Sequence, residues 1–128
     1  MPGIGRYTAL ALAKYGVKQL ALADINLEAM RTTADEIKKK HSDLEIKVLK
    51  LDVSKETSIE QAIDETVAQF GRIDFAVNNA GIAGANKPTV EVEMGDWQKL
   101  LDVNLTGVWL CQRAEIRQML KQEVVQSE

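Results

Sequence analysis

Apolar positions along the chain follow two periods, one typical of strands and one typical of helices. Short apolar runs with strand character occupy residues 19–23, 45–51 and 73–77. Apolar residues at helical spacing precede, separate and follow these runs, at 6–15, 27–40, 55–70 and 96–123. Strands this apolar have no face for solvent, which is typical of parallel strands covered by helices on both sides. The pattern therefore predicts an α/β protein built from parallel βαβ crossovers.

Polar residues and glycines mark the ends of the predicted elements. Asn26 is placed to cap the helix that begins at residue 27. Gly16 and Gly71 stand where the first and third helices are expected to stop, a usual place for glycine. Residues 78–89, which contain three glycine or proline residues, are predicted to form a loop.

Composition narrows the class of protein. The chain has 128 residues, with 16 Lys and Arg against 19 Asp and Glu, and a net charge of −3. The basic residues are scattered, so no nucleic-acid partner is expected. No apolar run approaches the ~18 residues of a membrane span, and the first residues do not resemble a signal peptide, so we expect a cytoplasmic protein with no membrane partner. One cysteine, Cys111, and one histidine, His41, predict no metal site. Without repeats or linkers, residues 1–128 are expected to form one domain.

Two features near the start of the chain suggest a dinucleotide site. Gly3-Ile4-Gly5 opens the first predicted helix, where unpaired N–H groups and the helix dipole favour a phosphate. Asp24 follows the first strand at about the 20-residue offset at which an acidic side chain binds an adenosine ribose. The alternatives are a plain helix start for the glycines and a turn for Asp24. Both interpretations stay open from these residues alone.

The next two strand ends carry similar sequences. Asp52-Val53 follows the second strand, where a carboxylate is placed either to accept the amine of an adenine or to cap the next helix. Asn78-Asn79-Ala80-Gly81 follows the third, where small residues let a sugar lie on the backbone or simply form a turn. Ligands of open α/β sheets bind beyond the carboxyl ends of the strands. The repetition therefore favours a binding crevice along this edge.

The last predicted helix carries a polar residue in an apolar stripe. The stripe steps by four and three residues through Trp97, Leu101, Asn104, Val108 and Cys111. A buried amide needs partners, so Asn104 is expected either to bond a neighbouring loop or to hold a water or a catalytic side chain. A second apolar side, with Leu100, Val103 and Leu110, suggests a subunit interface. A homo-oligomer formed through residues 96–123 is therefore one expectation.

The order and spacing of these motifs, with Asp102-Val103-Asn104-Leu105-Thr106-Gly107, resemble the short-chain dehydrogenase/reductase family through essentially the whole chain. The resemblance implies a Rossmann-type sheet and hydride transfer between a nicotinamide cofactor and a small-molecule alcohol or carbonyl. It assigns Gly3, Ile4 and Gly5 to the pyrophosphate loop, Asp24 to the adenosine ribose, Asp52 and Val53 to adenine, and Asn79, Ala80 and Gly81 to the cofactor sugars. It also makes Ile25 a cofactor-binding residue.

The resemblance also implies a catalytic role and a cofactor preference. Asn104 matches the active-site asparagine of the family, which holds a proton-relay water. The carboxylate of Asp24 would repel a 2′-phosphate, so NAD is expected rather than NADP.

The chain departs from the family pattern at both ends. In the family a first strand and a Thr-Gly pair precede the glycines, and a catalytic Ser and a Tyr-x-x-x-Lys motif follow the asparagine helix. Here only two residues precede Gly3, and neither Tyr7 nor Tyr15 has a lysine four residues later. We expect a partial Rossmann-type domain, without the first and the C-terminal strands, that is inactive by itself. The alternative is a non-catalytic dinucleotide-binding or decoy subunit that pairs with an intact relative.

The missing first strand has a structural consequence. In the family's sheet it lies between the strands that end here at Asp24 and Val77. Neighbouring strands lie about 4.8 Å apart, so a gap of two spacings is too wide for backbone hydrogen bonds. We expect either a new pairing of the two halves or open apolar edges.

Overall fold

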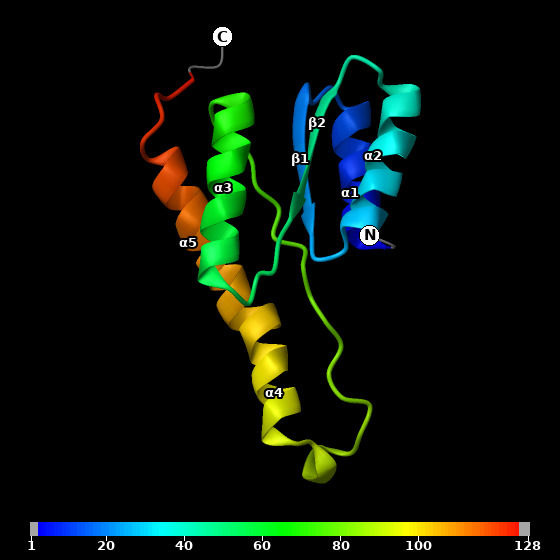
Figure 1. The fold of residues 1–128 in the computed structure, drawn as a ribbon, viewed down its shortest axis with the longest axis vertical. Coiled ribbons are helices and arrows are strands. Elements are labelled where there is room, and N and C mark those ends of the chain that lie inside the picture. The colour runs from blue at the N-terminus through cyan, green and yellow to red at the C-terminus, as the bar shows by residue number, and fades with distance from the viewer. Residues whose placement is uncertain (1–2, 126–128) are drawn as a thin grey trace.

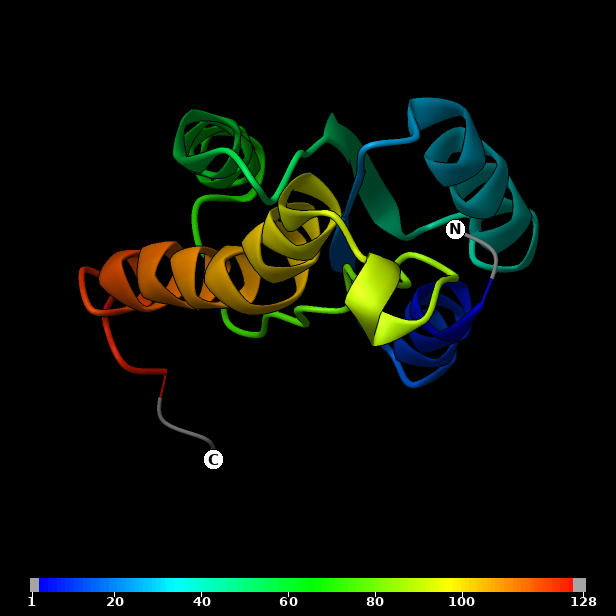
Figure 2. The same cartoon turned by 90° about the horizontal axis from the view of Figure 1, so that it is seen from below.

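The computed structural model describes residues 3–125 as a two-stranded parallel sheet with helices on both sides (Figure 1). The elements are α1 (Ile4–Lys14), β1 (Gln19–Asp24), α2 (Leu27–Lys40), β2 (Glu45–Lys50), α3 (Glu56–Phe70), the 3₁₀ turn η1 (Thr89–Glu91), α4 (Met94–Leu101), the π-helical segment η2 (Asp102–Gly107) and α5 (Val108–Met119). α1 and α2 cover one face of the sheet, and α3 and α5 lie on the other (Figures 1 and 2). The predicted α/β class is confirmed.

The two strands pair in parallel because α2 returns the chain to the start of the sheet. Their register runs from Gln19 opposite Glu45 to Asp24 opposite Lys50. One further hydrogen bond, from the N–H of Leu51 to the carbonyl of Asp24 at 3.0 Å, extends the ladder past the strand ends. The carboxyl ends of both strands are therefore held side by side.

The main hydrophobic core fills the space between the sheet and the α1–α2 pair. Its buried members are Ala9, Ala13, Leu22, Met30, Ala34, Ile37 and Leu44. Met30, Ile37 and Leu44 are the largest fully buried side chains of the described residues, and each contributes about 1.5–3 kcal/mol by leaving water. This core fixes α1 and α2 against β1, and so positions the start of α1 relative to the end of β1.

The local signals of α2 and α3 match the predicted boundaries. The Asn26 side chain accepts a hydrogen bond from the N–H of Ala29 at 3.0 Å and caps α2. Gly71 ends α3 in the left-handed conformation, with φ of 82°. The loop predicted after residue 78 is also present, since regular structure resumes only at η1.

The prediction of a third strand at 73–77 is wrong. Within the described residues the sheet contains only β1 and β2, and Phe75 and Val77 are 89% and 59% exposed. Figure 1 shows the segment running extended in the same direction as β1. A strand needs a neighbour about 4.8 Å away for its ladder, and this segment has none. Of the two expected outcomes, the structure has the open edges.

The ends of the 73–77 segment are nevertheless anchored. The amide of Gln122 accepts a hydrogen bond from the N–H of Ile73 and donates one to its carbonyl, both at 2.8 Å. At the other end, Nδ2 of Asn78 donates to the carboxylate of Glu115 at 2.9 Å. The segment is therefore held extended by side chains from the end of the chain and from α5, in place of a strand.

The predicted helix at 96–123 is also not continuous. It begins earlier, at Met94, is interrupted by the π-helical η2, and ends at Met119. The wider turn of a π-helix changes the phase of the helix, so the predicted stripe does not share one buried face. Of its five residues only Cys111 is buried, and Trp97 is 50% exposed. None of the helices formed by residues 3–125 is both long and apolar enough to cross a membrane.

Candidate functional site

One edge of the sheet gathers the residues predicted to bind a ligand. β1, β2 and the 73–77 segment run in the same direction, so Asp24, Asp52 and Asn78 leave them at the same end of the molecule (Figure 1). α1 runs the opposite way, and its N-terminus therefore lies at this edge too. The sequence-based expectation that these motifs follow one edge agrees with this arrangement.

A series of contacts links the residues along this edge. The carbonyl of Asp24 accepts the N–H of Leu51, next to Asp52. The carbonyl of Val53 then lies against Gly107, at 2.8 Å from the position that a Cβ would take there. Three residues before Gly107, the side chain of Asn104 bonds the backbone of Ile82, next to Gly81. The ends of both strands and the loop are thus connected through η2.

Asp24 forms the turn that was its alternative interpretation and still has an oxygen to offer. Its Oδ1 accepts the N–H of Asn26 at 3.0 Å, which shapes the turn into α2. Within residues 3–125, Oδ2 of Asp24 receives no hydrogen bond. A free carboxylate oxygen at a strand end is an acceptor for a hydroxyl group. The neighbouring Ile25 is 62% exposed, so this corner presents an apolar surface beside an acceptor.

Asp52 is partly engaged in its own turn. The hydroxyl of Ser54 donates to Oδ1 of Asp52 at 2.6 Å, and this hydrogen bond is the main reason that the pKa of Asp52 lies below its usual value. The N–H of Ser54 adds a second bond at 3.1 Å, and Lys55 lies 3.5 Å from Oδ2. Asp52 does not cap α3, whose N-cap residue is Lys55. Its carboxylate remains an acceptor at the edge.

Asn104 uses its whole amide to hold the loop after the third predicted strand. Oδ1 accepts the N–H of Ile82 and Nδ2 donates to the carbonyl of Ile82, both at 2.8 Å. This is the internal hydrogen bond that was one of the two alternatives for the residue. The prediction that Asn104 is buried is wrong, because the residue lies at the exposed edge. Its contact positions Gly81 and the exposed Asn79 and Ala80 beside η2.

Gly107 is a structural determinant of the edge that was not singled out from the sequence. A Cβ at this position would meet the carbonyl oxygens of Val53 and Asp102 at 2.8 and 2.9 Å. Only glycine allows η2 to approach the backbone after β2 this closely. An isolated glycine inside a helical pattern is the signal that could have identified this contact.

Behind the edge, α5 carries two half-buried or buried acidic groups that hold their protons more tightly. Burial raises the pKa of Glu115, against the opposing effect of the hydrogen bond from Asn78. Burial also raises the pKa of the Cys111 thiol to about 11, with a smaller effect from Glu115. A thiol with a raised pKa is unreactive at neutral pH, so Cys111 is a core residue rather than a nucleophile.

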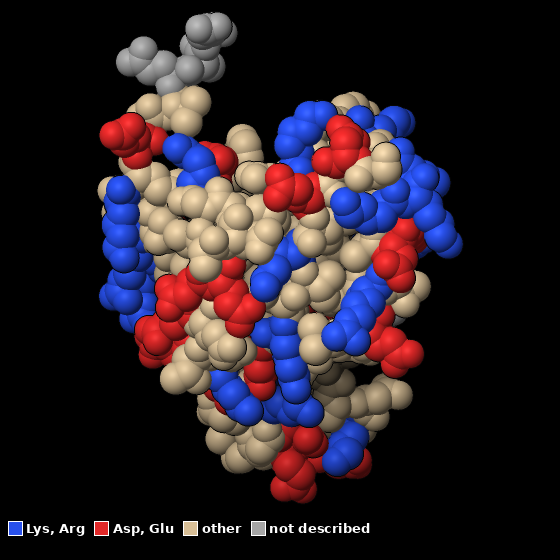
Figure 3. Space-filling view, turned by 45° about the horizontal axis from the view of Figure 1, so that its top comes forward, with Lys and Arg blue, Asp and Glu red and all other residues tan. Residues whose placement is uncertain are grey.

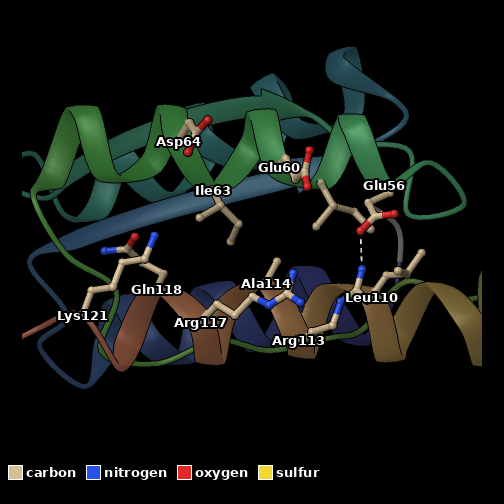
Figure 4. A pocket seen from close by; sticks show the side chains of 11 residues that line it. Glu56, Glu60, Ile63, Asp64, Leu110, Arg113, Ala114, Arg117, Gln118 and Lys121 are labelled. Carbon is tan, nitrogen blue, oxygen red and sulfur yellow. Dashed lines mark hydrogen bonds and ion pairs between the residues drawn. The ribbon is translucent and has the colours of Figure 1, made fainter.

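A groove between α3 and α5 lies apart from this edge. Figure 4 shows Glu56, Glu60 and Asp64 on α3 along one side of the groove, and Arg113 and Arg117 on α5, with Lys121 just after it, along the other. Glu56 and Arg113 are paired. Its volume of about 120 Å³ is well below the roughly 300 Å³ at which ligand sites begin. Figure 3 shows that positive and negative side chains are also mixed elsewhere, since Lys and Arg lie beside Asp and Glu across the face in view. The groove is therefore an interhelical contact rather than a ligand site.

Comparison with known proteins decides the family. A family model described as short chain dehydrogenase matches residues 1–125. The chain belongs to the short-chain dehydrogenase family. Short-chain dehydrogenase srdC of Neurospora crassa is 39% identical over an alignment of 127 residues, and the alignment covers 96% of this chain and 46% of that protein.

Solved structures of short-chain dehydrogenases share the fold. The crystal structure of levodione reductase matches with a TM-score of 0.88 and 34% identity, over 93% of this chain and 46% of that one. NAD⁺-bound xylitol dehydrogenase matches with a TM-score of 0.85 and 35% identity, over 91% of this chain and 44% of that one. A variant of actinorhodin polyketide ketoreductase with NADPH matches with a TM-score of 0.84 and 30% identity, over 93% and 45%. The chain thus has a Rossmann-like fold and spans under half the length of these relatives.

The residues at the edge fit the adenosine half of a nicotinamide dinucleotide. The 11-residue α1 directs its N-terminal N–H groups and positive dipole end toward the edge. Gly3, at φ of 114° and with nothing within 4 Å of the position of a Cβ, leaves the backbone open to a phosphate. Asp24 and Asp52 each present a carboxylate, which is an acceptor for a hydroxyl or an amine. These donors and acceptors are of the kinds that a phosphate, a ribose hydroxyl and an amine require.

Proposed function

We propose that this chain is the adenosine-binding portion of an NAD-dependent short-chain oxidoreductase that acts on a small-molecule alcohol or carbonyl. The observation that carries the proposal is the single edge shared by Gly3, Asp24, Asp52 and Asn104. Membership of the short-chain dehydrogenase family supports the reaction class. When bound, the nicotinamide ring supplies the hydride acceptor or donor. A cytoplasmic location is part of the proposal.

Different residues of the chain would bind different parts of the cofactor. Gly3, Ile4 and Gly5 would hold a phosphate against the N-terminus of α1, and Asp24 with Ile25 would orient the adenosine ribose. Asp52 and Val53 would flank the adenine, and Asn79, Ala80 and Gly81 would line the sugars. Asn104 would hold this last loop in place through Ile82.

We further propose that the chain does not turn over substrate alone. Its two tyrosines, Tyr7 and Tyr15, lie on or just after α1 and have no lysine four residues later. A general acid typically accelerates a reaction roughly 10²–10⁴-fold. Losing a whole set of catalytic residues that act together lowers the rate by more than that. NAD binding without alcohol oxidation is therefore the expected behaviour.

Cofactor titration tests the proposal. NAD and NADP are titrated into residues 1–128 and into the Asp24→Asn variant, with Trp fluorescence or calorimetry as readout. NAD should bind the wild type more tightly than NADP. Asp24→Asn should weaken NAD roughly tenfold, because one charge-assisted hydrogen bond is lost. Asp43→Asn is the matched control, since Asp43 pairs with Lys18 near the opposite end of the sheet.

Three results would contradict the proposal. Absence of NAD binding at millimolar concentration would reject the binding site, and a preference for NADP would reject the cofactor assignment. Oxidation of alcohols by the purified chain with NAD would reject the proposed inactivity.

A second candidate function is a non-catalytic subunit that pairs with an intact relative or with itself. The segment from α4 to the C-cap residue of α5 favours it, because its exposed apolar residues include Met94, Trp97, Leu105, Trp109, Ile116 and Leu120. Exposed apolar surface of this kind often marks an interface. Sedimentation of the chain with a full-length short-chain dehydrogenase would support this function if a mixed complex formed.

A further inference from the structure

An ion pair beside the phosphate-binding end of α1 has no role in the proposed site so far. Arg6 directly follows Gly5 and is the one cation in the first turn of α1. Its Nε donates to Oε2 of Glu36 at 3.0 Å, and its Nη2 lies 2.7 and 2.6 Å from Oε1 and Oε2. The two side chains are 30% and 31% exposed. This bidentate geometry is the strongest form of an Arg–carboxylate pair.

The pair holds the guanidinium away from the edge. Asn26 caps α2 at the edge, and Glu36 lies ten residues further along the chain. At 1.5 Å per residue, Glu36 is therefore roughly 15 Å along the helix axis from the cap. Arg6 itself is only three residues from Gly3, or about 4.5 Å along α1. Its side chain thus reaches from the edge into the seam between α1 and α2.

The direction of this side chain bears on the choice of cofactor. An arginine near the adenosine ribose accommodates the 2′-phosphate of NADP, whereas a carboxylate there binds the 2′-hydroxyl of NAD. Asp24 is the carboxylate, and Arg6 is the cation closest in sequence to the phosphate-binding glycines. The Nε and Nη2 groups of one guanidinium cannot pair with Glu36 and with a phosphate at the same time. Glu36 therefore competes with a 2′-phosphate for Arg6.

We propose that Glu36 is a specificity-determining positioning residue, which favours a ribose 2′-hydroxyl over a 2′-phosphate by holding Arg6 in the α1–α2 seam. The inference rests on the proposed function, because it concerns the ribose end of the same site. It adds a residue that lies outside the binding edge and acts on the ligand only through Arg6.

Two ligands that differ only in the 2′-phosphate test this role. AMP and adenosine 2′,5′-bisphosphate are titrated into residues 1–128 and into Glu36→Gln, which keeps the size of the side chain. The variant should raise the preference for the bisphosphate over AMP roughly tenfold, the effect of one charge-assisted hydrogen bond gained. Adding Arg6→Gln to Glu36→Gln should remove the gain. A purely structural role for Glu36 would change both affinities together and leave their ratio unaltered.

Controls separate the possible failures. Asp43→Asn removes the same charge from another ion pair and should leave the ratio at its wild-type value. Circular dichroism should show every variant folded, because a pair that is about one-third exposed adds little to stability. AMP binding with an unchanged ratio in Glu36→Gln would reject the inference alone, as would an equal change in Asp43→Asn. No binding of AMP to the wild type would reject the proposed function and the inference with it.

Discussion

The packing of the candidate site depends on single atoms at Gly107 and Asn104. Gly107 permits η2 to contact the backbone after β2, and Asn104 then reaches the loop at Ile82. The sequence indicated the polar residue, because an amide in an apolar stripe is conspicuous. The sequence predicted that this amide is buried, whereas Asn104 is exposed. The π-helical turn changes which face of the helix the residue lies on, and the apolar periodicity does not reveal such a turn in advance.

Replacing Gly107 by alanine should destabilise the chain by about 1–3 kcal/mol, because the added carbon meets two backbone oxygens that have little room to move. Urea unfolding measures the change. Gly95→Ala in α4 is the matched control, since nothing lies within 4 Å of its Cβ position. That variant should be stabilised by up to about 1 kcal/mol, from the better helix propensity of alanine. Equal effects at the two glycines would contradict the role of Gly107.

At the scale of elements, local signals decided where prediction succeeded. α2 was predicted with its full bounds because a cap, an amphipathic face and a basic last turn all agree. The apolar composition of residues 73–77 is typical of a strand, yet the segment forms no strand. Composition reports what a residue favours when paired, and pairing requires a second chain segment at the correct distance. No local pattern contains that information.

Hydrogen exchange should distinguish the unpaired segment from the sheet. The amides of Phe75, Ala76 and Val77 should exchange much faster than the amide of Leu51, which donates to Asp24. The amide of Ile73 should be protected by Gln122 and should lose that protection in a Gln122→Ala variant. Strong protection at residues 75–77 would mean that the segment pairs with another strand.

At the scale of the molecule, the order of the elements from α1 to α3 and the edge that carries the motifs followed from the sequence, because parallel crossovers place the strand ends on one side. The sequence did not indicate the Arg6–Glu36 and Asn78–Glu115 contacts. These pairs are 30 and 37 residues apart in the chain, and their formation depends on how the helices pack across the sheet.

Stability should fall at alkaline pH because of Cys111. The pKa of its thiol is 9.0 in an unfolded chain and about 11 in the fold. Below pH 9 both states hold the proton, whereas between the two values only the folded state does, so the free energy of unfolding decreases as pH rises. Denaturant unfolding should show a shallower decrease for Cys111→Ala. Between pH 6 and 8 the two curves should stay a constant distance apart, and parallel curves up to pH 11 would contradict the assignment.

Within residues 3–125, one flank of β1 has no partner strand and residues 75–77 are extended without pairing. Both features make the lifetime of the dissolved chain depend on its concentration. Free N–H and C=O groups along a strand serve as a template for any other strand that meets them, and the bare ring of Phe75 strengthens the encounter. Because two molecules must collide, the rate of aggregation grows with the square of concentration. Dilute samples would therefore remain monodisperse, whereas concentrated ones would scatter light before any loss of helical structure.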